Sequence, residues 1–173
     1  ANGLTLQKEG AGTQTLSGTA DNNSAVAIVN AGTLVLAKTS TGSVHALGSG
    51  GTALTINSGG TVQLAGTGGD QIYIQADVVV NAGGILETNG LTEGFDALSG
   101  AGNIRNTNAT GGTITVGQDN SGSTFSGTLG AAGANNLSLV KTGTGTLVLS
   151  GVSSFTGSTT VGNGILQMGV ANA

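Results

Sequence analysis

Apolar and polar residues alternate in short stretches along this chain. Val62 alternates with Leu64 across one polar residue, and Ile114 alternates with Val116 in the same way. A period of two is typical of a β-strand that buries one of its faces. Many of the apolar residues are β-branched and Thr is abundant, which favours strands over helices. We therefore predict an all-β protein with almost no helix.

A short unit recurs through the middle of the sequence: Asn, a small residue, Gly, and then an apolar strand. Copies begin at Asn30, Asn57 and Asn81, and residues 110–116 repeat the strand without the leading Asn. The Gly supplies the positive φ that a tight corner needs. One such turn cannot bury its own apolar face, whereas stacked turns can. At about 20 to 30 residues per turn and about 4.8 Å per strand, the chain would make roughly six to eight turns and a column on the order of 30 to 40 Å long.

The composition is unusual for a globular protein. Charged residues make up 7% of the 173 residues and aromatic residues 2%, and there are 34 Gly, no Pro and no Cys. Disorder is disfavoured, because it requires low hydrophobicity and high net charge, and the formal net charge is only −4. The lack of Cys excludes disulfides and thiolate metal sites. The basic residues are scattered singly, which argues against nucleic acid as a partner: Lys8, Lys38, Arg105 and Lys141. No apolar run approaches the roughly 20 residues that span a bilayer.

A longer repeat joins the two ends of the sequence. Residues 6–18 and 139–151 share Leu, Lys, Gly, Gly, Thr, Leu, Ser and Gly at a constant offset. Each block is followed by a Ser/Thr/Asn-rich stretch and a second strand, at residues 31–36 in the first copy and 163–168 in the last.

These motifs resemble the autotransporter-associated β-strand repeat, also called the passenger-associated transport repeat. Residues 137–168 match its pattern nearly throughout: a Lys-x-Gly-x-Gly block, a Leu-Ser-Gly step, an aromatic-Thr-Gly step at Phe155 and a final Gly-x-Leu strand. Residues 4–36 match more loosely, because residues 20–24 replace the aromatic step, and residues 37–136 share only the general rhythm. The resemblance implies a right-handed parallel β-helix (β-solenoid) from the passenger of an autotransporter or a related large surface protein. It also implies a location outside the cell or on the bacterial outer surface. Such repeats are similar to secretion-assisting elements, whose stepwise folding outside the cell is thought to help draw the chain across the outer membrane.

We expect residues 1–173 to form a single β-solenoid domain, which is a segment of a longer repeat array. The expected function is that of a structural or adhesive segment, a passenger stalk or adhesin, and not that of an enzyme. The alternative is a self-assembling solenoid that forms fibres or cell–cell contacts, and a third hypothesis is a carbohydrate-active β-helix enzyme. Expected partners are other copies, through end turns or polar faces, and a host or neighbouring-cell surface or glycan. No nucleic acid partner and no transmembrane segment are expected.

Titratable residues offer little catalytic chemistry. His45 is the only histidine, and the sequence has no Gly-x-Ser-x-Gly elbow that would accompany it in a hydrolase, so we expect a turn or surface histidine. Glu93 and Asp96 are the closest acidic pair, but clustered Asp with several basic residues, as in pectin-degrading β-helices, is lacking. We therefore assign no catalytic residue and no cofactor. The acidic residues considered are Glu9, Asp21, Asp70, Asp77, Glu87, Glu93, Asp96 and Asp119.

Two local patterns leave alternatives open. Residues 65–73 nearly fit a calcium-binding nonapeptide in which Asp70 would be the ligand. Only one copy exists, however, so we favour a Gly-rich corner that ends in a solvated Asp70 and assign no metal. Phe95, Phe125 and Phe155 are spaced by 30 residues twice. They form either an aromatic ladder on one side of the column or separate core residues.

Overall fold

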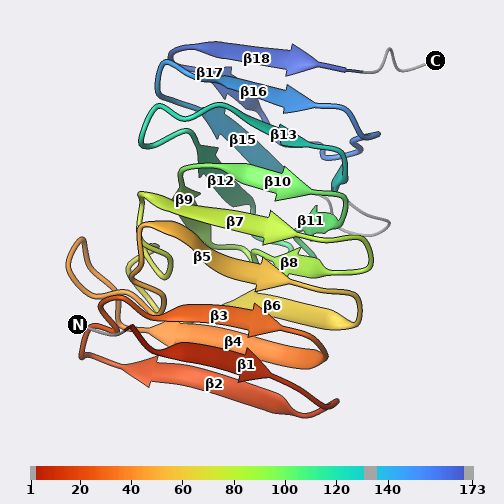
Figure 1. Ribbon diagram of the computed structural model, residues 1–173. Coiled ribbons are helices and arrows are strands. Elements are labelled where there is room, and N and C mark those ends of the chain that lie inside the picture. Colours follow the sequence, from red (N-terminus) through yellow and green to blue (C-terminus); the bar gives the residue numbers. More distant parts are fainter. Residues whose placement is uncertain (1–2, 131–135, 170–173) are drawn as a thin grey trace.

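The computed structural model describes residues 3–130 and 136–169, and it shows a column of parallel strands (Figure 1). The column has about seven turns, within the range that the repeat spacing predicts. Eighteen strands and no helix occur in these residues, which confirms the predicted all-β fold.

Three parallel sheets form the sides of the column. The first sheet runs its whole length and contains β1 (Thr5–Lys8), β3 (Val26–Val29), β5 (Gly51–Ile56), β7 (Ala76–Val80), β10 (Leu98–Gly100), β13 (Ser123–Phe125), β16 (Thr146–Leu149) and β18 (Ile165–Met168). The second contains β2 (Thr13–Gly18), β4 (Gly32–Lys38), β6 (Gly60–Leu64), β8 (Ile85–Glu87), β11 (Asn103–Arg105) and β14 (Thr128–Leu129). The third begins only in the fourth turn and contains β9 (Thr92–Phe95), β12 (Gly112–Val116), β15 (Leu137–Lys141) and β17 (Thr159–Val161).

The path of the chain gives the column its hand. In Figure 1 the strands of the first sheet lie in front and point to the right, while the strands behind them, such as β12 and β15, point back to the left as the chain rises. This is a right-handed coil, as the family resemblance implies. It is also the hand that parallel strands adopt in nearly all crossover connections.

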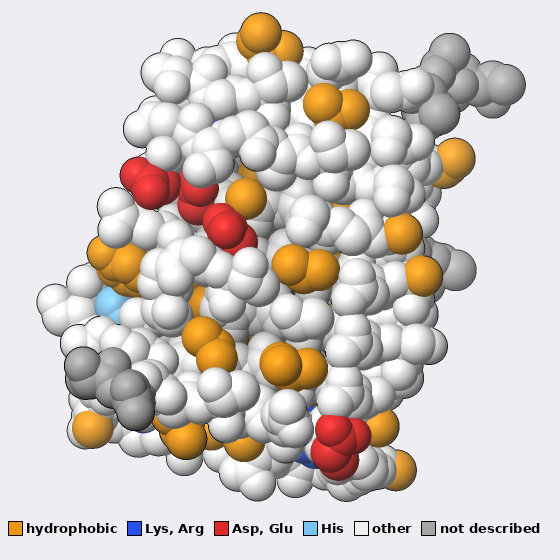
Figure 2. Space-filling view, viewed as in Figure 1, with side chains coloured by type: hydrophobic (Ala, Val, Ile, Leu, Met, Phe, Trp, Pro, Cys, Tyr) orange, Lys and Arg blue, Asp and Glu red, His pale blue; other side chains and the backbone are white. Residues whose placement is uncertain are grey.

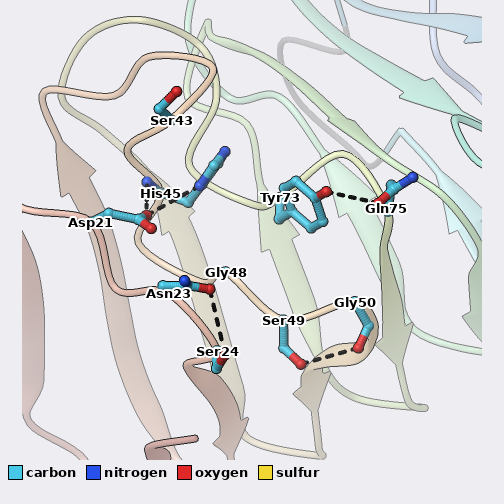
Figure 3. Close-up of a pocket in the computed structure, with 10 residues that line it drawn as sticks. All are labelled: Asp21, Asn23, Ser24, Ser43, His45, Gly48, Ser49, Gly50, Tyr73 and Gln75. Carbon is cyan, nitrogen blue, oxygen red and sulfur yellow. Dashed lines mark hydrogen bonds and ion pairs between the residues drawn. The ribbon is translucent and has the colours of Figure 1, made fainter. Parts of the chain in front are cut away.

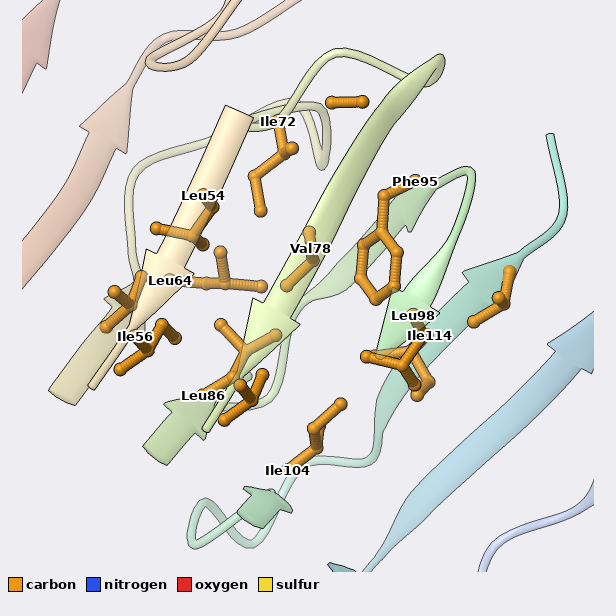
Figure 4. Close-up of a cluster of buried hydrophobic side chains, with 14 of the residues drawn as sticks. Leu54, Ile56, Leu64, Ile72, Val78, Leu86, Phe95, Leu98, Ile104 and Ile114 are labelled. Atoms are coloured by element: carbon orange, nitrogen blue, oxygen red, sulfur yellow. The ribbon is translucent and has the colours of Figure 1, made fainter. Parts of the chain in front are cut away.

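The interior is built from aliphatic residues at alternate positions. Figure 4 shows their side chains pointing into the space between the sheets. Val62 and Leu64 are fully buried, as are Ile114 and Val116, which confirms the period-two prediction. Parallel register then stacks like on like along the second sheet. The resulting ladder crosses five turns and comprises Leu34, Val62, Leu86, Ile104 and Leu129.

The three phenylalanines do not form a ladder. Phe95 lies in β9 of the third sheet and pairs with Val116. Phe125 lies in β13 of the first sheet, in register with Gly100 in the adjacent turn. Both rings are fully buried, whereas Phe155 is partly buried against the core from outside the strands. The ladder hypothesis is wrong, because successive turns differ in length and a constant spacing does not keep residues on one side.

Asparagine side chains stack at the corner between the first two sheets. The amide of Asn57 donates to Asn30 Oδ1 at 2.6 Å, and the amide of Asn81 donates to Asn57 Oδ1 at 2.7 Å. The glycine two residues after each Asn has a positive φ, which confirms the predicted role of the Asn-x-Gly corner. The side-chain stack adds a second line of hydrogen bonds between turns beside those of the backbone.

The two copies of the longer repeat share a corner but occupy different sides of the column. Lys8 is the last residue of a first-sheet strand, and the corner after it leads to the second sheet, whereas Lys141 is the last residue of a third-sheet strand, and its corner leads to the first sheet. In both copies the buried ammonium group bonds to the carbonyls of the next two residues. Lys8 Nζ donates to Glu9 O and Gly10 O, and Lys141 Nζ donates to Thr142 O and Gly143 O. The motif therefore encodes a local corner rather than a particular side.

A glycine of the next turn lies directly on each corner. A Cβ atom at Gly32 would stand 2.5 Å from the carbonyl oxygens of both Gly10 and Gly12. Gly164 lies in the same way on the carbonyl oxygens of Gly143 and Gly145, and its φ of 67° matches the 69° of Gly32. No side chain fits at either position, so this glycine is a steric requirement of the stacked repeat.

We expect Gly32→Ala to destabilise the protein by at least about 2 kcal/mol, because the new methyl group must displace backbone and the residue must keep a positive φ. Chemical denaturation followed by circular dichroism measures this change. Gly42→Ala is the matched control, since nothing lies within 4 Å of a Cβ there. A Gly32→Ala variant as stable as the control would contradict the stacking requirement.

Candidate functional site

The third side of the first three turns carries loops in place of a sheet. These loops cover residues 19–25, 39–50 and 65–75, and they bulge from the lower part of the column in Figure 1. Two isolated parallel bridges, Asn23 with Gly48 and Leu47 with Ile72, keep successive loops in contact. The only histidine and the only tyrosine of the sequence lie on this side.

His45 is held between two carboxylates from the turns before and after it. Its Nδ1 lies 3.2 Å from Asp21 Oδ1, and its Nε2 lies 3.5 Å from Asp70 Oδ2. The backbone N–H of His45 also donates to Asp21 Oδ1 at 2.8 Å. Of the expected turn or surface histidine, the surface alternative is wrong, because His45 is only 6% exposed; the residue does lie in the loop that follows the turn at residues 42–43. Its position follows from the stacking of three turns, which the sequence around it does not reveal.

Asp70 is also not the solvated corner that the sequence indicates. Its side chain is 16% exposed and faces His45, and its backbone N–H donates to Ser40 Oγ. Burial raises the pKa of Asp70, while the neighbouring His45 opposes this rise by charge and by hydrogen bonding. Among residues 3–130 and 136–169, no group of three or more His, Cys, Asp or Glu side chains is arranged to hold a metal ion.

Glu93 adds a further buried carboxyl group in the fourth turn, next to the level of Asp70. It is fully buried, and its two oxygens accept hydrogen bonds from the backbone N–H groups of Gln71 and Gly94. Burial raises the pKa of Glu93 to about 8, and the negative charge of Asp70 adds to this effect although the backbone donors oppose it. Asp96, the other member of the sequence pair, instead accepts from the backbone N–H of Asp119. The two carboxyl groups thus serve different parts of the fold.

The basic residues satisfy buried acceptors. Lys38 donates to Ala20 O and Asn22 Oδ1. Arg105 Nε donates to Glu87 Oε2 at 2.9 Å, and this ion pair was not anticipated from the sequence. The sequence does contain a signal for the burial of Lys38, because this residue falls on the inward-facing phase of its strand. Burial lowers the pKa of Lys141, against the opposing charge of Asp96.

A polar hollow of about 540 Å³ opens beside His45 (Figure 3). The ring of Tyr73 meets the ring of His45 edge to face, with 5.3 Å between centroids, and the Tyr73 hydroxyl donates to Gln75 Oε1 at 2.7 Å. No Lys or Arg side chain belongs to the lining. The lining residues are Asp21, Asn23, Ser24, Ser43, His45, Gly48, Ser49, Gly50, Tyr73 and Gln75.

The remaining surface on the face that Figure 2 shows lacks extended patches of one residue type. On the face that Figure 2 shows, charged side chains form a few small groups and hydrophobic side chains are dispersed among other side chains and backbone. This face therefore offers no large charged or apolar patch.

Both copies of the longer repeat match the model of a known protein family. The model of the passenger-associated-transport-repeat matches residues 6–36 and 139–168. The chain carries two passenger-associated transport repeats. Both matches include the Lys-x-Gly-x-Gly corner and the glycine that lies on it, so the family pattern coincides with the corner geometry described above. Comparisons with curated proteins and with solved structures gave no match.

The two repeats and the β-solenoid together support an autotransporter passenger-like surface protein. The repeat family implies a protein that is secreted or exposed at the cell surface. Within the described part of the chain, no helix is long and apolar enough to cross a membrane.

We expect the stability of the protein to fall as pH rises from about 5 to about 8. The pKa of Glu93 is raised from 4.5 to about 8 in the folded state, so the folded protein retains a proton that the unfolded chain releases in this range. The expected slope from this group is about 1.4 kcal/mol per pH unit at most. Glu93→Gln should flatten the profile, with a smaller slope remaining from Asp70 at the acidic end. Urea unfolding at several pH values tests this, and an equal slope in both proteins would contradict it.

Proposed function

We propose that this chain is a structural segment of an autotransporter passenger, and that it forms an adhesive stalk at the bacterial surface. The observation that carries the proposal is the identical corner in the two repeats, at opposite ends of the described column. A corner that forms on more than one side of the column lets a repeat be added without a dedicated partner. Such a module suits a chain that folds turn by turn as it emerges from the outer membrane.

The composition supports the same proposal. The sequence has no Cys and no Pro, so neither disulfide formation nor proline isomerisation delays folding after transport. Exposed Ser, Thr, Asn and Gln side chains, and a hollow lined by hydroxyl, amide and carboxyl groups, provide hydrogen-bonding sites for adhesion.

Display on cells tests the proposal. We expect the chain, fused to the membrane translocator of an unrelated autotransporter, to reach the surface of intact bacteria and to increase their attachment to host cells or to one another. Gly164→Ala should lower the protease-accessible amount several-fold, because it disrupts the corner of the second repeat. Gly42→Ala should leave this amount unchanged. Normal surface amounts of a Gly164→Ala variant that is unfolded in purified form, or display without any attachment, would contradict the proposal.

A second candidate function is end-to-end self-association. At the C-terminal end of the described column, β17 and β18 each pair on one side only. Val161, Ile165 and Met168 are about half exposed there. Strand edges with apolar side chains are templates for further strands, which either a following turn of the same protein or the first turn of a second copy can supply.

We expect the purified chain to form elongated oligomers that Met168→Lys prevents, because Met168 is in register with the buried Leu149 and a copy stacked on β18 would bury the new charge without a partner. Analytical ultracentrifugation and electron microscopy measure the assembly. Ile74→Lys is the control, because Ile74 is also exposed and apolar but lies midway along the column. A purified chain that stays monomeric at high concentration would exclude this second function.

A further inference from the structure

The geometry points to the hollow beside His45 and Tyr73 as a binding site for one neutral sugar ring of a surface glycan. This assignment rests on the adhesive part of the proposed function and gives that adhesion a site and a ligand class.

The hollow has the size and the construction of a small-molecule site. Its volume of about 540 Å³ lies within the range of about 300 to 1,000 Å³ that ligand sites occupy. Three successive turns contribute to it, with Asp21 and Asn23 from the first, His45 from the second and Tyr73 from the third. Because these turns are joined by parallel pairing, the site is formed before a ligand arrives.

The lining offers what a sugar ring requires. Tyr73 is a partly buried aromatic side chain that lines the hollow, and an aromatic ring packs against the C–H face of a sugar while its hydroxyl bonds at the edge. Around it stand groups that can donate to or accept from sugar hydroxyls: Asn23, Ser43, Ser49 and Gln75. Both hydrogen bonds to the carboxylate of Asp21 use Oδ1, which leaves the lone pairs of Oδ2 for a ligand hydroxyl.

Hydrogen bonds within the site fix these groups in advance. His45 is clamped by Asp21 and Asp70, and its ring supports the edge of Tyr73. The Tyr73 hydroxyl donates a hydrogen bond to Gln75 Oε1, so the amide nitrogen of Gln75 can donate to other acceptors. Side chains that are already ordered lose little entropy when a ligand binds.

The carboxylates at the hollow favour neutral sugars over anionic ones. The lining contains Asp21, Asp70 lies behind His45, and no Lys or Arg side chain lines the hollow to offset them. A uronic or sialic acid would bring its carboxylate beside Asp21, while the ring of His45 is already held between Asp21 and Asp70, and a negative charge without a cationic partner of its own is costly to bury.

The sequence supplies two built-in reporters for the test. It has no Trp, one Tyr and one His. Intrinsic protein fluorescence therefore comes mainly from Tyr73, and the imidazole NMR signals of the untagged chain come from His45 alone.

Immobilised neutral and anionic glycans are screened first at high density, because multivalent display makes weak single-site binding detectable. Soluble forms of the glycans that bind are then titrated against both reporters.

We expect neutral glycans to bind with a dissociation constant on the order of 1 mM per ring and to shift both signals. Gln75→Ala and Asn23→Ala should weaken binding at least about fivefold, and Tyr73→Ala at least about tenfold. Gln63→Ala is the matched control, because Gln63 lies in β6 on the second sheet, away from the hollow, and should bind as the unaltered chain does. Circular dichroism confirms the fold of each variant, and the exposed Asn23 keeps the test valid if Tyr73→Ala does not fold.

Several results would overturn the assignment: no binding of any neutral glycan, binding of anionic glycans alone, or binding unaffected by Asn23→Ala and Gln75→Ala. The outcome is separable from the proposed function. If displayed chains that carry both Asn23→Ala and Gln75→Ala still mediate attachment, the hollow is not the adhesive site, and the proposal of an adhesive stalk stands. Failure of the unaltered chain to reach the surface would instead remove the proposed function itself.

Discussion

Backbone pairing between successive turns is the interaction on which this structure depends. Every strand pair in the described residues is parallel, and all but the end strands of each sheet pair on both sides. The constraint that follows is spatial, because each corner must repeat at the height of one strand above the last. Carbonyl oxygens of one turn then press against the next turn, and at Gly32 and Gly164 only a glycine leaves them room. A wealth of glycine and a lack of bulky residues are consequences of this close stacking.

Tight corners also leave carbonyl groups that no strand can satisfy. The lysine of the repeat meets this need from inside the column, since Lys8 and Lys141 each bond to the two carbonyls that follow. The same interaction works on different sides because it is confined to the corner and to the glycine stacked on it. This explains why a repeat of fixed spacing recurs at both ends of the described column although the sheets that it joins differ.

Sequence patterns predicted what depends on near neighbours. Alternation located the strands, and Asn-x-Gly located corners, because both are set within a few residues. The position of a residue around the column depends instead on the length of every intervening turn, and the stacked asparagines show turns of 27 and 24 residues. The predicted phenylalanine ladder failed for this reason. The burial of His45 and Asp70 escaped prediction likewise, since their partners come from other turns and no local motif marks them.

The site lies where it does because the third sheet is incomplete. Without strands on that side, side chains must satisfy the backbone of the first turns: Gln71 accepts from Lys38 N and donates to Lys38 O, as a neighbouring strand would. Glu93 takes up the N–H of Gln71 in turn, at the level where β9 begins the third sheet. Buried polar groups thus bridge the gap between a side made of loops and a side made of strands. A side of loops can vary its surface residues without disturbing the ladder, and in this molecule it is also the side that carries Tyr73, His45 and the hollow between the turns.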